Sequence, residues 1–170
     1  AKPVFYLDNS TLNFGTANPL FTINNNSIGV HANNSSIIGS SSYELGQNSV
    51  GIYSNNPTTT VKNDVASTIT SIAGSSPNAK GIVVKNGNVE NAGLIALTGD
   101  KAVGVYLEGN GSNTVINTGK VIMNGDEAIG IYSTGVSSLI NNGGEVKVGN
   151  SSSLSTPSIG IYTNAASITS

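Results

Sequence analysis

The stretch that decides the fold is Asn117-Thr-Gly-Lys-Val-Ile-Met-Asn-Gly-Asp-Glu-Ala-Ile-Gly-Ile-Tyr132, because the chain carries a second copy of it 26 residues earlier. The earlier copy reads Asn91-Ala-Gly-Leu-Ile-Ala-Leu-Thr-Gly-Asp-Lys-Ala-Val-Gly-Val-Tyr106, and the two align without a gap. The matching positions include the first Asn, every Gly, the Asp and the final Tyr. Self-similarity of this kind is typical of a repeat protein.

The closing signature, apolar-Gly-apolar-Tyr, recurs along the chain. Further copies are Val50-Gly-Ile-Tyr53 and Ile159-Gly-Ile-Tyr162, with weaker ones at Ile28-Gly-Val-His31 and Lys80-Gly-Ile-Val83. The signature glycines follow one another at intervals of 22, 30, 23, 26 and 30 residues, at Gly29, Gly51, Gly81, Gly104, Gly130 and Gly160. A second marker, apolar-x-Asn, begins between them at Val61, Val89, Val115 and Leu139.

Each repeat holds about three short β segments separated by turns rich in Gly, Asn and Ser. In the best-formed unit these segments are Ala102–Leu107, Thr114–Asn117 and Lys120–Met123. Three strands in 22 to 30 residues predict an all-β fold, a right-handed parallel β-helix of about six coils. A sandwich would not repeat one turn at one strand position six times, and a propeller blade needs about 40 residues and four strands. A leucine-rich repeat would require Leu and a helical return.

The whole chain, 1–170, is expected to form one β-helix segment, with regular coils over 28–170. Residues 1–27 follow the repeat poorly and predict an irregular first coil, with strands over Tyr6–Phe14 and Leu20–Ile23. Neither end resembles a polar cap, and an uncapped β-helix exposes unpaired strand edges. We therefore expect a fragment of a longer chain, whose neighbouring coils pack on both ends. The insertions at Ser54–Thr60 and Asn150–Pro157, and the similar segment around Ser75-Ser-Pro-Asn78, should project from turns.

Side chains alternate along a β-strand, which predicts the two faces of the signature. The first face would be inward and would carry the β-branched pairs Val103/Val105, Ile129/Ile131 and Ile159/Ile161. The opposite face would carry the signature Gly and Tyr.

Composition excludes several classes of function. Charged residues make up 9% of the chain, the net charge is −2, and there is no Cys. Seven scattered Lys without any Arg give no basic stripe, so nucleic acid is excluded as a partner. No apolar run approaches the roughly 20 residues of a membrane span, so this segment is not expected to insert into a membrane. The lack of Cys excludes a disulfide scaffold.

The residues that could carry chemistry are few, and we predict no enzyme activity, no catalytic residue, no metal site and no cofactor. His31 stands at the Tyr position of the first signature, where it is expected to be a substituted ladder residue. Asp100 and Asp126 occupy equivalent turns and should stack, with Asn150 next in line; turn geometry explains them better than a weak Ca²⁺ site or catalysis. The acidic residues Glu90, Glu108, Glu127 and Glu145 are dispersed over different repeat positions.

The candidate ligand-binding residues are the repeated tyrosines and the glycines two positions before them. They are Tyr53, Tyr106, Tyr132 and Tyr162, together with Gly104 and Gly130. Stacked aromatic pairs contribute about 0.5–1.5 kcal/mol each to stability. A flat glycine strip beside aromatic rings could also seat a sugar ring or a partner's side chains. Both roles remain open at this level.

The unit Asn-x-Gly-x-apolar-x-apolar-x-Gly-Asp-x-Ala-apolar-Gly-apolar-Tyr resembles passenger repeats of the large type V autotransporter adhesins of Gram-negative bacteria. The resemblance extends well over Lys80–Tyr162. It implies export through an outer-membrane β-barrel that this chain lacks, and display at the cell surface. It also implies attachment to a host or bacterial surface protein or glycan, and offers no catalytic residues to carry over. The alternatives are a carbohydrate-active β-helix, lyase-like or tailspike-like, and a purely structural spacer.

Overall fold

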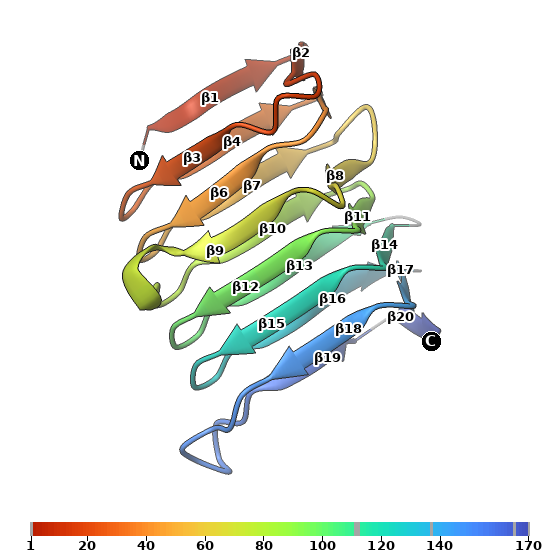
Figure 1. Ribbon diagram of the computed structural model, residues 1–170. Coiled ribbons are helices and arrows are strands. Elements are labelled where there is room, and N and C mark those ends of the chain that lie inside the picture. Colours follow the sequence, from red (N-terminus) through yellow and green to blue (C-terminus); the bar gives the residue numbers. More distant parts are fainter. Residues whose placement is uncertain (1, 111–112, 137, 165, 170) are drawn as a thin grey trace.

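The chain folds into a right-handed parallel β-helix of about six turns, as predicted from the repeat (Figure 1). The computed structural model describes residues 2–110, 113–136, 138–164 and 166–169. Each coil runs along one long sheet, crosses a short sheet and returns along a second long sheet before the next coil begins below it (Figure 1).

Most of the strands belong to three parallel sheets, each of which is formed by equivalent strands of successive coils. The seven-stranded sheet consists of β1 (Pro3–Asp8), β4 (Ile28–Asn33), β7 (Val50–Asn55), β10 (Lys80–Lys85), β13 (Val103–Asn110), β16 (Ile129–Val136) and β19 (Ile159–Thr163). The five-stranded sheet consists of β8 (Val61–Asn63), β11 (Val89–Asn91), β14 (Thr114–Asn117), β17 (Ser138–Asn142) and β20 (Ala166–Thr169). The six-stranded sheet consists of β3 (Leu20–Ile23), β6 (Ser42–Leu45), β9 (Thr68–Ser71), β12 (Leu94–Thr98), β15 (Lys120–Asn124) and β18 (Glu145–Val148).

Strands pair in parallel with their equivalents one coil away. Val105 lies opposite Ile131, and Asn91 lies opposite Asn117, which confirms the alignment at an offset of 26. The remaining elements are the paired strands β2 (Thr11–Asn13) and β5 (Ser36–Ile38) and the 3₁₀ turn η1 (Ile72–Gly74). Among the insertions, the loop between β18 and β19 projects far enough to leave Leu154 fully exposed.

The first coil follows the same plan as the others. Strand β1 pairs with β4 so that Tyr6 lies opposite His31, and β3 pairs with β6. The strand expected over Tyr6–Phe14 is instead two strands, β1 and β2, separated by a turn at Asn9, whose φ is +49°. Val4 stands where later coils have the signature glycine, and this substitution hides the repeat in the sequence.

The core is a set of vertical files of aliphatic side chains between the sheets. Ile95, Val105, Val121 and Ile131 have no exposed surface. At the N-terminal end the file is aromatic, because Phe5, Phe14 and Phe21 pack together with ring centroids 5.3–5.8 Å apart. Burying each such side chain contributes roughly 1.5–3 kcal/mol.

The predicted faces of the signature need one correction, because strict alternation is broken at the glycine. A Cβ placed on Gly104 would lie 2.7 Å from Cγ1 of Val121, a core residue of the six-stranded sheet. The glycine therefore faces the interior, and so does Val105 beside it. The residue before the glycine is turned outward and remains half-buried in most coils, at Ile28, Val50, Lys80, Ile129 and Ile159. The charged side chain of Lys80 in this file is the feature of the sequence that indicates an outward position.

A substitution distinguishes the inward from the outward placement of the glycine. In Gly104→Ala the new methyl group would lie 2.6 Å from the carbonyl oxygen of Gly130, so we expect a loss of about 2–3 kcal/mol, as for overpacked cores. Gly143→Ala is the control, because its Cβ would meet no atom within 4 Å. Urea denaturation of both variants measures the difference. Equal urea midpoints for the two variants would show that Gly104 faces the outer surface.

A ladder of asparagines, buried except for the half-buried Asn142, lines one corner of the coil, where the apolar-x-Asn marker falls. The Nδ2 group of Asn63 donates to Oδ1 of Asn91, Asn91 donates to Asn117, and Asn117 donates to Asn142, each at 2.7 Å. The last marker is shifted by one residue from the predicted position. Ile140 is fully buried and pairs with Val115, whereas Leu139 is 38% exposed.

Candidate functional site

One outward file of the seven-stranded sheet, the aromatic column, gathers the tyrosines predicted as binding residues. Strand pairing places Tyr53, Tyr106, Tyr132 and Tyr162 at one register, with Val83 between Tyr53 and Tyr106. The column also includes Tyr6 and His31, so His31 takes the ladder position expected for it. Tyr6 was missed because its coil lacks the signature glycine.

The rings of the column form two groups on either side of Val83. Tyr106 and Tyr132 stack with centroids 4.9 Å apart and planes 13° apart, and Tyr132 and Tyr162 stack at 4.9 Å and 5°. His31 meets Tyr6 and Tyr53 edge to face, at 5.2 and 4.8 Å. In the stacked group each ring covers the face of its neighbour, so an incoming ligand meets mainly ring edges and hydroxyl groups.

The files beside the aromatic column differ from those expected. Gly104 and Gly130 do not flank the rings, because both are buried and face the core. On one side the column is bordered by the mostly half-buried file that precedes the glycines, which consists of Ile and Val side chains together with Lys80. On the other side lies a polar file, two residues after the aromatic position, which consists of Asp8, Asn33, Asn55, Lys85, Glu108 and Thr134.

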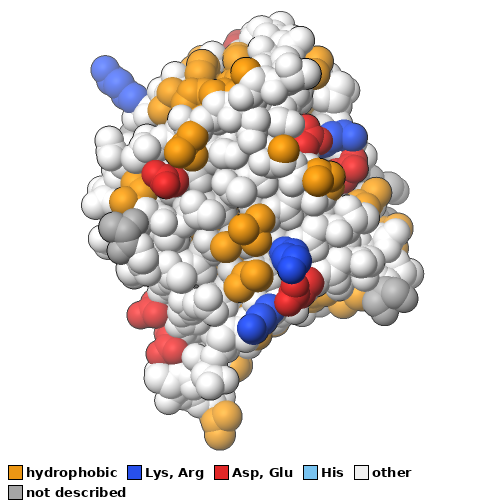
Figure 2. Space-filling model, in the orientation of Figure 1, with side chains coloured by type: hydrophobic (Ala, Val, Ile, Leu, Met, Phe, Trp, Pro, Cys, Tyr) orange, Lys and Arg blue, Asp and Glu red, His pale blue; other side chains and the backbone are white. Residues whose placement is uncertain are grey.

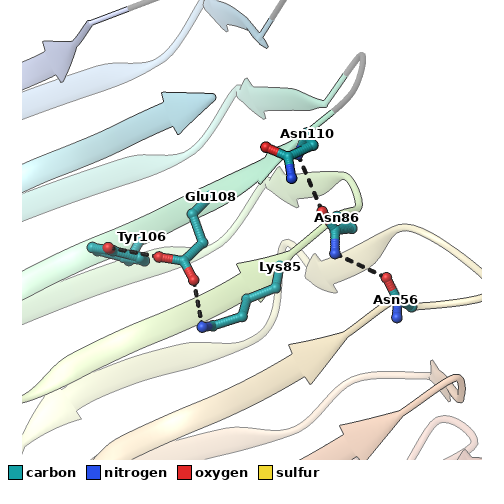
Figure 3. A network of polar contacts seen from close by, with 6 residues as sticks. All are labelled: Asn56, Lys85, Asn86, Tyr106, Glu108 and Asn110. Atoms are coloured by element: carbon teal, nitrogen blue, oxygen red, sulfur yellow. Dashed lines mark hydrogen bonds and ion pairs between the residues drawn. The ribbon is translucent and has the colours of Figure 1, made fainter. Parts of the chain in front are cut away.

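The polar file and the aromatic column meet in a hydrogen-bonded network on β10 and β13 (Figure 3). The hydroxyl of Tyr106 donates to Oε2 of Glu108 at 2.8 Å, and the ammonium of Lys85 pairs with Oε1 of the same carboxylate. In the adjoining turn Nδ2 of Asn86 donates to Oδ1 of Asn56 at 3.0 Å, and the backbone N–H of Asn110 donates to Oδ1 of Asn86 at 3.2 Å. Sequence reasoning missed this network, although Lys85 and Glu108 both stand four residues after a signature glycine.

These contacts shift the ionisation of all three partners. The hydrogen bond from Lys85 lowers the pKa of Glu108, and the hydrogen bond with Glu108 raises the pKa of Lys85. Burial, followed by the hydrogen bond to the carboxylate, raises the pKa of Tyr106 to about 12. At neutral pH the network therefore holds a neutral phenol and a charged pair.

The lowered pKa of Glu108 makes a pH dependence testable. Because the folded state favours the carboxylate, the contribution is complete above the ordinary pKa of 4.5 and is lost as pH falls through the lower folded value. Between pH 5 and pH 3 the melting temperature of Glu108→Gln should therefore fall less than that of the wild type. The difference between the two falls should be less than about 3 °C, since partly exposed ion pairs are weak. Parallel melting curves at both pH values measure this. Identical acid sensitivity would contradict the shift.

Charged side chains elsewhere also pair between neighbouring coils at equal repeat positions. Nζ–O distances are 2.8 Å for Lys62–Glu90, 3.8 Å for Lys101–Glu127 and 3.3 Å for Lys120–Glu145. On the face seen in Figure 2, Lys and acidic side chains touch at two places, and most of the remaining surface is uncharged. The four glutamates thus lie at four different repeat positions, as expected, and each shares its own position with a lysine of a neighbouring coil. Each pair avoids the repulsion that stacked like charges would create.

The other residues considered for chemistry serve turns. The backbone N–H of Asp126 donates to Oδ1 of Asp100 at 3.0 Å, and the next residue in this file is Ser152 rather than Asn150, with its N–H 2.9 Å from Oδ1 of Asp126. Within the described part of the chain, no three His, Asp or Glu side chains gather closely enough to hold a metal ion. None of the helical residues described there forms a helix of sufficient length and apolarity to cross a membrane.

The aromatic column and its network therefore form the candidate functional surface. A shallow groove of about 420 Å³ follows the glycines Gly93, Gly119 and Gly144 on another corner, where tight stacking of successive turns already explains the small residues. Comparison with protein-family models, with curated proteins and with solved structures found no match to the chain.

Proposed function

We propose that this chain is a non-enzymatic adhesive segment of a bacterial cell-surface protein, which projects and presents a binding surface. The surface is the outer face of the seven-stranded sheet, and the partner is a glycan or protein on a host cell or another bacterium. The observation that carries the proposal is the aromatic column, in which six of the seven described strands of the sheet place an aromatic ring at one outward register beside a polar file.

The fold and the side chains support this role in different ways. Coils spaced about 4.8 Å apart make a rod roughly 30 Å long over six spacings, which suits a projecting element. Tyr is enriched at binding interfaces because it combines a rigid apolar ring with a hydroxyl that can hydrogen bond. Tyr6 is 64% exposed and Tyr162 is 38% exposed, so both groups of the column reach solvent. As in the autotransporter adhesins that the repeat resembles, display would be at the outer surface of a Gram-negative cell.

Removing the rings tests the proposal. The triple variant Tyr106→Ser/Tyr132→Ser/Tyr162→Ser should bind cells or arrayed glycans at least about tenfold more weakly, since aromatic anchors in interfaces contribute 2 kcal/mol or more. The matched control is Ile116→Ser/Leu139→Ser on the five-stranded sheet, where both side chains are 38% exposed. Circular dichroism of each variant checks that the β structure is retained.

Three results would count against the proposal. Wild-type binding by the triple variant would confine the aromatic column to a structural role. A wild-type chain that binds neither cells nor glycans would make it a spacer. Cleavage of polygalacturonate by the wild type would overturn the non-enzymatic assignment in favour of a carbohydrate-active β-helix.

A further inference from the structure

A hollow of about 350 Å³ lies beside the network, where β10, β13 and β16 end. It spans three coils and combines the polar side chains of Lys85, Asn86, Glu108, Asn110 and Thr134 with two glycines. Figure 3 shows the side chains of Lys85, Glu108, Asn86 and Asn110 on the strand ends and turns around this position. The volume lies within the range of small-ligand pockets.

The column of turn residues beside the hollow changes identity at this level. The positive-φ position after the strand is Asn34 in the coil of β4, Asn56 in that of β7 and Asn86 in that of β10. In the next two coils the equivalent positions are Gly109 and Gly135, which have no side chain. The chain of amide side chains therefore stops at Asn86, whose Oδ1 accepts a hydrogen bond from the backbone N–H of Asn110. The backbone of Gly109 passes close to Asn86, because a Cβ on Gly109 would lie 2.6 Å from that Oδ1.

The charges around the hollow cancel. Lys85 and Glu108 face each other across neighbouring strands as an ion pair, so the site has no net charge. An anion would be opposed by the carboxylate of Glu108, and a cation would be opposed by the ammonium of Lys85. The complementary ligand is therefore uncharged.

The unused hydrogen-bond donors and acceptors at the hollow restrict the chemical class of the ligand further. An ammonium has three donors and a carboxylate about four acceptor sites, whereas Lys85 and Glu108 use one donor and two acceptor sites in the network. Asn110 and Thr134 add a side-chain amide and a hydroxyl at the rim. Donors and acceptors close together match neighbouring hydroxyl groups, since each hydroxyl both donates and accepts.

On the basis of the proposed adhesive function, we infer that the hollow bounded by Lys85, Glu108 and Asn110 binds an uncharged sugar residue of the partner glycan. The carboxylate accepts hydrogen bonds from the sugar hydroxyls and the ammonium donates to them. Tyr106 does not line the hollow, but its hydroxyl holds the carboxylate of Glu108 in place from the side of the aromatic column.

A glycan array that contains neutral, sialylated and sulfated glycans, followed by calorimetric titration of the best neutral glycan, tests this inference. The wild type should bind neutral glycans, and Glu108→Gln should weaken that binding about tenfold or more, because hydrogen bonds to a charged group are among the strongest. Glu90→Gln is the matched control, because it breaks the equivalent inter-coil pair with Lys62 away from the hollow. Asn110→Ala, at an exposed position, should weaken binding severalfold without affecting folding.

The outcomes separate this inference from the proposed function. Exclusive binding of sialylated or sulfated glycans, or equal loss in Glu108→Gln and Glu90→Gln, would overturn the sugar site and leave the adhesive role standing. Attachment to cells without binding to any glycan would do the same and would indicate a protein receptor. Failure of the wild type to bind cells or glycans would overturn both.

Discussion

Replacing Ile131 with Asp should unfold the coils around β16. The Ile131 side chain has no exposed surface, and its file in the core continues through Val105 and Ile161, its register neighbours. A carboxylate there would be buried without a partner in addition to the lost apolar packing, and we expect a loss of more than about 4 kcal/mol. Urea denaturation followed by circular dichroism measures it.

Ile129→Asp is the control that makes this variant informative. Ile129 lies two residues earlier on the same strand, and regular alternation would bury it equally. In the structure it belongs to the half-buried outward file that also contains Lys80, so the same carboxylate should be partly solvated and should cost far less. If the two variants have the same stability, Ile129 does not face outward and the alternation is not broken at the glycine.

Among the variants proposed, removal of one asparagine from the ladder should cause the second largest loss of stability. Asn91 is fully buried, accepts from Asn63 and donates to Asn117. Asn91→Ala leaves a donor and an acceptor of the two neighbours unpaired in the interior, at about 1–3 kcal/mol each, so we expect a loss of about 4 kcal/mol. The melting temperature should fall by roughly 8–16 °C for a chain of this size.

Asn55→Ala is the matched control for the ladder. Asn55 also links two coils, because its Nδ2 group donates to Oδ1 of Asn33 at 3.1 Å, but it lies at the partly exposed end of β7. Water can replace the lost partner there, and the expected loss is within about 1 kcal/mol. Equal losses in the two variants would show that burial does not set the value of the ladder.

The sequence predicted the fold because the fold is the repeat itself. Once the Gly104 and Gly130 signatures are aligned, parallel pairing at an offset of 26 and a shared register for Tyr106 and Tyr132 follow. The first coil was predicted to be irregular for a local reason, since Val4 replaces the glycine. The ladder was displaced at its last rung because Leu139-Ile-Asn141 and Ile140-Asn-Asn142 both satisfy apolar-x-Asn, and only pairing with β14 selects the second.

The candidate site was predicted in part. Register alone placed Tyr53, Tyr106, Tyr132 and Tyr162 in one file, whereas the orientation of Gly104 and Gly130 depended on an alternation that the backbone does not keep. The pairing of Lys85 with Glu108 was accessible from the aligned glycines. The hollow beside it was not, because its opening depends on how side chains of three coils leave space unfilled.

The ladder of asparagines has a genetic consequence. Its rungs join each coil only to the coils directly above and below, through the same amide pair every time. Duplication or loss of the DNA that encodes one complete coil would therefore return an unbroken ladder, provided the inserted unit carries Asn at that corner. Gain or loss of one unit such as 91–106 or 117–132, which are identical at seven of 16 positions, would change the reach of the molecule in steps of one coil.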